Sequence, residues 1–199
     1  FAPGSVAKME QRVRDAAQSS IATFRNKTSC EFMAEFAAPF PVGVALDLLG
    51  LPKERMEDFL KWEGMLLHSG QFDIMAEGVR NVASYLREVI AERKDNLGDD
   101  LISHAIKAEI QGRKMNDDEL QGYAFNFYIG GLDTVTANLG NHVRHLATNL
   151  EQQRYLRENP KQIRAAVEEF MRAFAAVTTY RICARETSIR GVTIKPGDK

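Results

Sequence analysis

Five consecutive residues, Gly130-Gly131-Leu132-Asp133-Thr134, combine the groups needed to bring protons to a bound ligand. The two glycines leave a gap where a flat, bulky group can approach the backbone, and an acid and an alcohol follow directly. A glycine inside a helix costs about 1 kcal/mol relative to alanine, so the pair needs a reason. The alternative is close packing of the glycines against another helix, and the spacing alone favours this alternative.

Helix geometry predicts how the acid and the alcohol would point. Consecutive helical residues are about 100° apart, so Asp133 can face solvent while Thr134 faces a pocket. Thr134 follows Gly130 by four residues, so its hydroxyl can donate to the Gly130 carbonyl and open the helix locally. The segment is therefore a candidate proton-delivery site.

A second pattern, Glu169-Phe170-Met171-Arg172, places an acid and a base three residues apart on one helix face. Similar spacings occur elsewhere in the chain, and the ordinary interpretation is a solvated surface ion pair of little energetic weight. What distinguishes Glu169 and Arg172 is their position. They lie on an apolar helix that leads directly into a β-rich segment, and Glu169 is 35 residues beyond Thr134.

The cysteine and histidine patterns predict no metal site. Cys30 and Cys183 lie far apart without a Cys-x-x-Cys motif, which indicates reduced thiols rather than a zinc site or a disulfide. The histidines have no carboxylate at ligand spacing, so exposed or packed histidines are the better interpretation. These histidines are His68, His104, His142 and His145.

The elements that position these residues are mostly helical. Apolar residues keep a 3.6-residue period up to Thr148, and Asn116 with Glu119 forms a capping-box pattern, so we expect one helix over about 117–148. The 30 residues of the periodic stretch would span about 45 Å, enough to cross a whole domain. A second helix is expected over about 163–174.

Two segments carry strand patterns. Residues 30–36 alternate in a way that suggests a short strand, and residues 178–199 are β-rich with Gly191 as a hairpin turn. The expected fold class is therefore mainly α with a small β appendage, in a single domain segment covering residues 1–199.

Composition excludes several classes of protein. The chain has 199 residues, 44% of them hydrophobic, and a formal net charge of −1, which rules out a disordered chain and disfavours nucleic-acid binding through a basic field. No apolar run reaches the length of about 18 residues needed for a membrane span. The charge is uneven, because residues 144–199 carry 11 Lys/Arg and 6 Asp/Glu, whereas residues 1–143 have a net charge of −6.

The order of these motifs resembles one family. Gly130 to Thr134 resembles the oxygen-activating I-helix motif, Ala/Gly-Gly-x-Asp/Glu-Thr, of the cytochrome P-450 monooxygenases. Glu169-x-x-Arg172 resembles the Glu-x-x-Arg pair of their K helix, at the family's distance. With the segment at Arg181-Ile182, these motifs are most similar to the bacterial camphor-hydroxylase branch. The resemblance covers essentially the whole chain and implies a partial cytochrome P-450 fold, from helix D to helix K plus β strands.

The resemblance implies roles for the long helix. Gly130 and Gly131 would let the haem cofactor and bound oxygen lie against the helix. Thr134 would organise the hydrogen bonds that deliver protons, and Asp133 would relay protons from solvent.

The resemblance also implies roles outside that motif. Glu169 and Arg172 would form a buried structural pair that positions the haem-ligand loop, and breaking such a pair leaves an uncompensated charge. Arg181 would hold a haem propionate, for which its bidentate guanidinium is suited. The substrate pocket would be lined by Asn126, Ile129 and Val177.

The chain departs from the family pattern in two places. Thr179 stands where camphor-type relatives place an acid, two positions before the propionate arginine. The family's haem-ligating Cys lies in a Phe-x-x-Gly-x-x-x-Cys-x-Gly loop that this sequence lacks. We therefore expect the middle of a protein about twice as long, with no metal ligand in this chain and the proximal Cys beyond Lys199.

The implied function is haem-dependent hydroxylation of a small hydrophobic substrate, with a terpenoid as the family-level expectation, using O2 and electrons from a ferredoxin. The basic segment, with Arg154, Arg157 and Lys161, would dock an acidic ferredoxin. We expect a bacterial cytoplasmic protein without nucleic-acid or membrane partners. The alternative is a haem-free helical scaffold or regulatory protein that keeps the helices without the chemistry.

Overall fold

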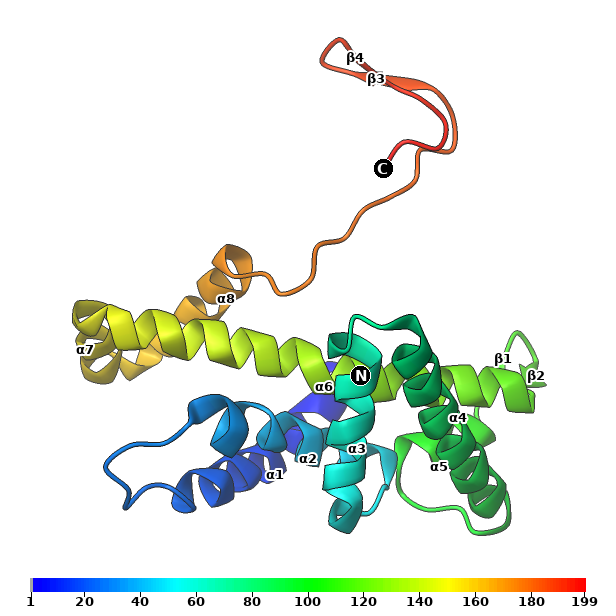
Figure 1. Ribbon diagram of the computed structural model, residues 1–199, viewed down its shortest axis with the longest axis horizontal. Helices are drawn as coiled ribbons and strands as arrows, with labels where there is room; N and C mark the ends of the chain where they lie inside the picture. Colours follow the sequence, from blue (N-terminus) through cyan, green and yellow to red (C-terminus); the bar gives the residue numbers. More distant parts are fainter. Residues whose placement is uncertain (1) are drawn as a thin grey trace. The chain divides into compact units, whose positions relative to one another are not determined.

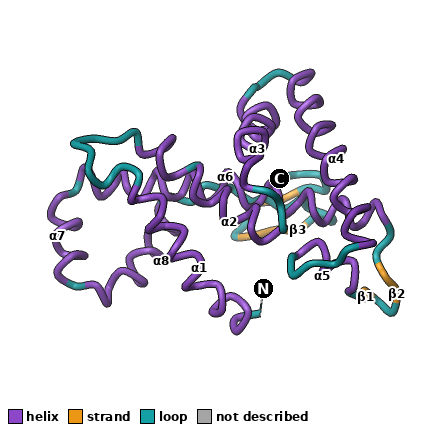
Figure 2. Tube along the Cα trace, turned by 90° about the horizontal axis from the view of Figure 1, so that it is seen from below, coloured by secondary structure: helices purple, strands orange, loops and turns teal. Residues whose placement is uncertain are grey.

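The computed structural model describes residues 2–199, which fall into two compact units, one ending at Leu150 and one covering Glu151–Lys199. Helices dominate both views of the chain, and the strands form two short hairpins (Figures 1 and 2). The fold class is therefore mainly α with a small β appendage, as predicted. The expected single domain segment over residues 1–199 stays a prediction.

The first unit contains the longer helices. Its α-helices are α1 (Pro3–Ala22), α2 (Pro39–Leu49), α3 (Met56–Glu63), α4 (Phe72–Asp95), α5 (Leu101–Lys107) and α6 (Asp117–Thr148). Shorter elements are the π-helical turns η1 (Met33–Ala37) and η3 (Gly64–His68), the 3-10 turn η2 (Lys53–Arg55), and the hairpin of β1 (Glu109–Ile110) with β2 (Arg113–Lys114).

The second unit begins within α7 (Leu150–Glu158), one residue after the start of that helix. It also contains the 3-10 turn η4 (Pro160–Gln162), α8 (Ile163–Ala173) and the antiparallel strands β3 (Thr187–Ile189) and β4 (Val192–Ile194). Gly191 turns this hairpin with a φ of +80°, a left-handed conformation that glycine adopts without strain. The predicted turn at Gly191 is confirmed.

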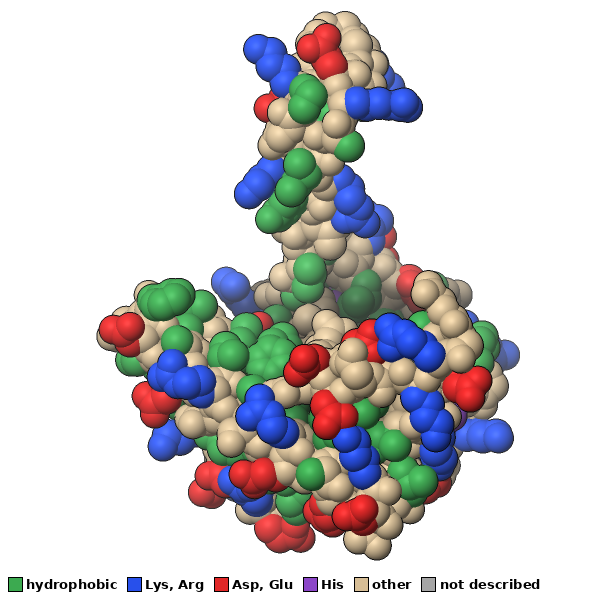
Figure 3. Space-filling model, turned by 90° about the vertical axis from the view of Figure 1, so that its right-hand side faces the viewer, with side chains coloured by type: hydrophobic (Ala, Val, Ile, Leu, Met, Phe, Trp, Pro, Cys, Tyr) green, Lys and Arg blue, Asp and Glu red, His purple; other side chains and the backbone are tan. Residues whose placement is uncertain are grey.

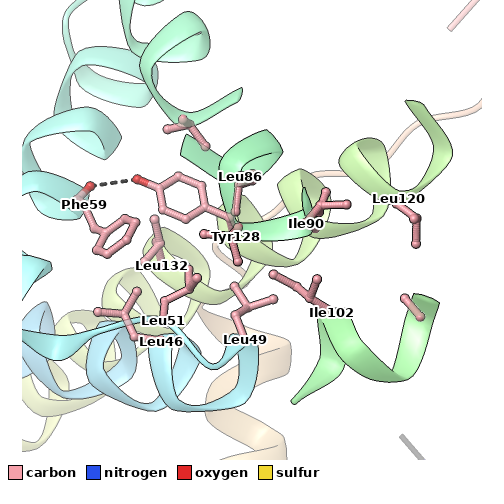
Figure 4. Packing of buried hydrophobic residues seen from close by; sticks show 14 of the residues in the cluster. Leu46, Leu49, Leu51, Phe59, Leu86, Ile90, Ile102, Leu120, Tyr128 and Leu132 are labelled. Atoms are coloured by element: carbon pink, nitrogen blue, oxygen red, sulfur yellow. Dashed lines mark hydrogen bonds between the residues drawn. The ribbon is translucent and has the colours of Figure 1, made fainter. Parts of the chain in front are cut away.

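The core of the first unit is built around α6. Tyr128 and Leu132 of α6 are each 1% exposed, and they pack with Phe59 of α3 and Leu86 of α4 (Figure 4). The Tyr128 hydroxyl donates to the Phe59 carbonyl at 2.8 Å, so the buried phenol is hydrogen-bonded. Burial raises the pKa of Tyr128, which keeps the phenol in its donor form. The core thus fixes the middle of α6.

The beginning of α6 follows the sequence pattern. The Asn116 side chain accepts from the Glu119 backbone nitrogen at 2.9 Å, and the Glu119 carboxylate accepts from the Asn116 backbone nitrogen at 2.8 Å. This reciprocal capping box satisfies two donors at the helix end. Arg113 donates twice to Glu119, and this contact with the capping bond lowers the pKa of Glu119 to about 2. The helix runs continuously from Asp117 to Thr148, which confirms the predicted element.

The predicted strand at residues 30–36 is wrong. Phe32, Phe36 and Phe40 recur every four residues, which is a helical spacing, and their successive ring centroids are 5.4 and 5.1 Å apart. Stacking of these rings outweighs the local alternation, and the segment forms η1 instead.

The β-rich region is only partly strand. Among the described residues, 178–186 belong to no strand, although the Cys183 backbone nitrogen donates to the Asp198 carbonyl at 2.9 Å. Only residues that find a hairpin partner become strands, which are β3 and β4. Within residues 2–199 no helix combines the length and apolar character needed to cross a membrane.

Candidate active site on helix α6

The two adjacent glycines of α6 have different surroundings. A Cβ added at Gly130 would meet no atom within 4 Å, so that side of the helix is open. A Cβ added at Gly131 would lie 2.8 Å from the Ala45 Cβ of α2. The packing alternative therefore accounts for Gly131. Open space beside the helix was expected at both glycines, and it is present at Gly130 but not at Gly131.

A cleft of about 310 Å³ borders the open glycine. From α6 it is lined by Asn126, Phe127, Gly130 and Gly131, and from α2 and α5 by Ala45, Leu48, Leu49 and Leu101. The lining side chains are apolar apart from the amide of Asn126, so the cleft suits a flat apolar group with a hydrogen-bonding edge. Ile129 instead packs against the core and does not line this cleft.

Thr134 and Asp133 point to different neighbours, as helix geometry predicts. The Thr134 hydroxyl donates to the Gly130 carbonyl at 2.8 Å, which confirms the expected bond. The helix does not open there, because α6 is α-helical throughout Asp117–Thr148. The Asn138 side-chain amide donates to the Thr134 carbonyl at 2.8 Å. Asp133 Oδ1 lies 3.4 Å from His68 Nε2, and the Asp133 side chain is 37% exposed. The alcohol thus sits beside the open glycine and the acid lies beside η3.

Glu63 is a further acid at this site, and the sequence analysis missed it. It ends α3, is 9% exposed, and lies beside His68 and Asp133. Burial, and then the negative charge of Asp133, raise the pKa of Glu63, while His68 acts in the opposite direction. One sequence signal was available, because Glu63 follows the buried Phe59 by four residues and so falls on the apolar face of α3.

The second predicted pair forms on the surface. Arg172 donates to both carboxylate oxygens of Glu169 at 2.6 and 2.7 Å, which lowers the pKa of Glu169. The side chains of Glu169 and Arg172 are 58% and 73% exposed in this chain, where α8 has no buried residue. The predicted burial of the pair and its role in positioning the haem-ligand loop stay predictions for the full-length protein. A pair this exposed contributes little to stability.

Two other predicted residues belong to the second unit. Val177 is exposed, and the Arg181 guanidinium donates to the Tyr180 carbonyl at 2.9 Å. Both lie in a segment without regular structure. The roles predicted for Val177 at a substrate and for Arg181 at a propionate stay predictions.

The site thus combines a long central helix, an open glycine, a threonine hydrogen-bonded back to that glycine and an adjacent acid. Residues 58–199 match the family model for cytochrome P-450. The chain belongs to this family, whose members use haem iron as their cofactor.

Individual relatives come from several bacteria. The chain is 34% identical over 174 residues to the protein named Probable cytochrome P-450 127A1 of Sinorhizobium fredii, covering 87% of this chain and 42% of that protein. It is 33% identical to erythromycin C-12 hydroxylase of Saccharopolyspora erythraea, covering 100% of this chain and 51% of that enzyme. The chain therefore spans about half the length of the curated relatives it matches.

Solved structures show the same fold. The cytochrome P-450 PksS of Bacillus subtilis superposes with a TM-score of 0.92 at 26% identity, over 100% of this chain and 52% of that one. CYP101J2 superposes with a TM-score of 0.85 at 32% identity, over 99% of this chain and 49% of that one. The described chain is thus a partial cytochrome P-450 fold, as the resemblance implied.

Proposed function

We propose that this chain belongs to a bacterial haem-dependent monooxygenase and forms the oxygen-activation side of its haem pocket. The observation that carries the proposal is the open Gly130 with the Thr134 hydroxyl hydrogen-bonded to its carbonyl. Haem, when bound, supplies the binding and reductive activation of O2. The residues on the open face of α6 fit such a group, because an apolar cleft reaches the backbone where Gly130 has no side chain.

Thr134 is suited to hold a proton donor in the pocket. Its hydroxyl donates to the Gly130 carbonyl, so its oxygen lone pairs are left to accept a hydrogen bond from water or a protonated ligand. The Gly130 carbonyl fixes the direction of the hydroxyl, which is the preorganisation that proton transfer needs.

Asp133 is suited to exchange protons with solvent. Its side chain is 37% exposed and lies one residue from Thr134, so it can take up a proton outside the cleft and supply it toward the pocket side of the helix. The contact with His68 holds the carboxylate on the solvent side of α6.

The substrate proposal rests on the apolar cleft and on the relatives' names. A vitamin D(3) 25-hydroxylase and two steroid C26-monooxygenases are among these relatives, which supports a hydrophobic substrate. A terpenoid is the substrate class we propose, and the Asn126 amide offers it one hydrogen-bonding group. The proposed electron donor is an acidic ferredoxin. It would dock on the basic residues Arg154, Arg157 and Lys161, which are exposed.

The test is the coupling of oxygen consumption to product formation in the full-length protein. Thr134→Ala removes the hydroxyl and should lower the product formed per O2 consumed by at least about tenfold. Thr134→Ser keeps the hydroxyl and should retain coupling near that of the unsubstituted protein. Equal coupling in Thr134→Ala and the unsubstituted protein would show that Thr134 does not deliver protons. A full-length protein that purifies without haem would favour the scaffold alternative.

A further inference from the structure

Three side chains from distant parts of the sequence meet beside α6. Glu63 ends α3, His68 ends η3, and Asp133 lies within α6. Their donor atoms all lie within 4.8 Å of one another, and His68 Nε2 is 3.4 Å from Asp133 Oδ1. We infer that Glu63, His68 and Asp133 form a binding site for one divalent transition-metal ion of the zinc class, separate from the haem cleft.

The π-helical turn explains how Glu63 and His68 come together. Residues five apart in an α-helix point about 140° away from each other, so an uninterrupted α-helix would separate the two side chains. The i→i+5 register of η3 widens the turn and brings residues five apart onto one face. This local departure from α-helical geometry occurs where the metal-ligating side chains gather, and π-turns are frequent at functional sites.

Close packing by α4 supports the π-turn. A Cβ added at Gly78 of α4 would lie 3.1 Å from the Met65 Cβ, and 3.2 Å from the Leu66 nitrogen and the Trp62 carbonyl oxygen. The backbone of α4 therefore lies directly against η3, and a side chain at Gly78 would push the turn away.

The three side chains are better stabilised by a bound zinc-class ion than by their contacts with one another. Glu63 is 9% exposed, and its carboxylate lies within 4.8 Å of the donor atoms of His68 and Asp133. Two carboxylates this close together repel each other, and partial burial of one of them strengthens that repulsion. A divalent cation would offset both charges. One imidazole and two carboxylates are ordinary ligands for Zn²⁺, with a coordination position left for water.

Access to the site is open from solvent. The His68 side chain is 58% exposed and Asp133 is 37% exposed, whereas Glu63 forms the buried end of the site. An ion can therefore enter without rearrangement of the core. Sequence spacing alone cannot reveal the site, because Asp133 lies 65 residues beyond His68 in the chain.

Metal occupancy would also affect Asp133, and this consequence alone rests on the proposed function. An ion bound to the Asp133 carboxylate holds it away from proton exchange, so Zn²⁺ should slow turnover. Binding itself does not depend on that role.

The test is calorimetric titration of the chelator-treated full-length protein with Zn²⁺, with bound zinc counted by elemental analysis. We expect one ion per chain at this site. His68→Gln and Asp133→Asn should each weaken its affinity by at least about tenfold. His68 is exposed and Asp133→Asn is isosteric, so both variants should fold. His104→Gln, which changes another exposed histidine, is the matched control and should bind as the unsubstituted protein does.

Two results would overturn the metal site. One is equal zinc affinity in His68→Gln, Asp133→Asn and His104→Gln, because the ion would then lie elsewhere. The other is no zinc binding below about 1 mM in the unsubstituted protein. Zinc that binds through these residues without slowing turnover would support the metal site and contradict the role proposed for Asp133.

Discussion

At the residue scale, the two adjacent glycines of α6 differ in whether the structure has space for an added methyl group. Gly131 is needed because α2 approaches it closely, and the Ala45 Cβ occupies the place where a side chain would lie. Gly130 has open space beside it, so the folded unit does not explain why a glycine stands there. The functional interpretation of the pair therefore rests on Gly130 alone.

This difference predicts the stability of two matched variants. Gly131→Ala should lower the free energy of unfolding by about 1–3 kcal/mol, because the helices must separate to admit the methyl group. Gly130→Ala should leave stability unchanged or raise it by up to about 1 kcal/mol, since alanine is the better helix former. Urea unfolding followed by circular dichroism measures both values. A larger loss in Gly130→Ala than in Gly131→Ala would contradict the packing described for α2 and α6.

At the element scale, the start of α6 depends on one exposed carboxylate. Glu119 accepts from Asn116 and from Arg113, and its pKa is lowered to about 2. A carboxyl whose folded-state pKa lies below its unfolded value stabilises the fold above the unfolded value, about 4.3. That contribution is lost as the pH falls from about 4.3 through about 2.

Glu119→Gln therefore tests the pH dependence. The unsubstituted protein should lose more stability than Glu119→Gln between pH 5 and pH 2, because the amide cannot be protonated in this range. Urea midpoints at a series of pH values, with NMR titration of the Glu119 carboxyl, give the measurement. Parallel pH profiles for the two proteins would mean that Glu119 does not contribute through its charge.

The elements also show where sequence reasoning succeeds and fails. The period and capping residues of α6 are local signals, so its bounds and its Thr134–Gly130 bond could be predicted from the chain. The π-turn η3 has no comparable signal, because its register depends on close packing by Gly78 of α4. Glu63 and Asp133 meet only through that tertiary arrangement, which no spacing in the sequence encodes.

At the scale of the whole molecule, charge is distributed unevenly along the chain. On the face shown in Figure 3, Lys/Arg and Asp/Glu side chains are mixed over much of the surface. The excess of basic residues lies in residues 144–199, and includes Arg154, Arg157 and Lys161. Complementary charge chiefly sets association rates and their dependence on salt.

Reversing these three charges to Glu should therefore slow reduction by an acidic ferredoxin and flatten its dependence on ionic strength. Stopped-flow reduction of the full-length protein at several salt concentrations gives both quantities. The matched control reverses three exposed basic residues of the acidic part of the chain, Lys8, Arg14 and Arg25. An unchanged rate and salt dependence in the triple variant would show that the donor docks elsewhere.

The central claim is that the open face of α6 at Gly130 and Thr134 borders the haem. The most direct test is the infrared stretching band of carbon monoxide bound to the reduced full-length protein, because this band responds to the groups beside the bound gas. Gly130→Ala and Thr134→Val should each shift the band, whereas Val135→Ala, one residue further around the helix, should leave it in place. An unshifted band in both Gly130→Ala and Thr134→Val would contradict the account.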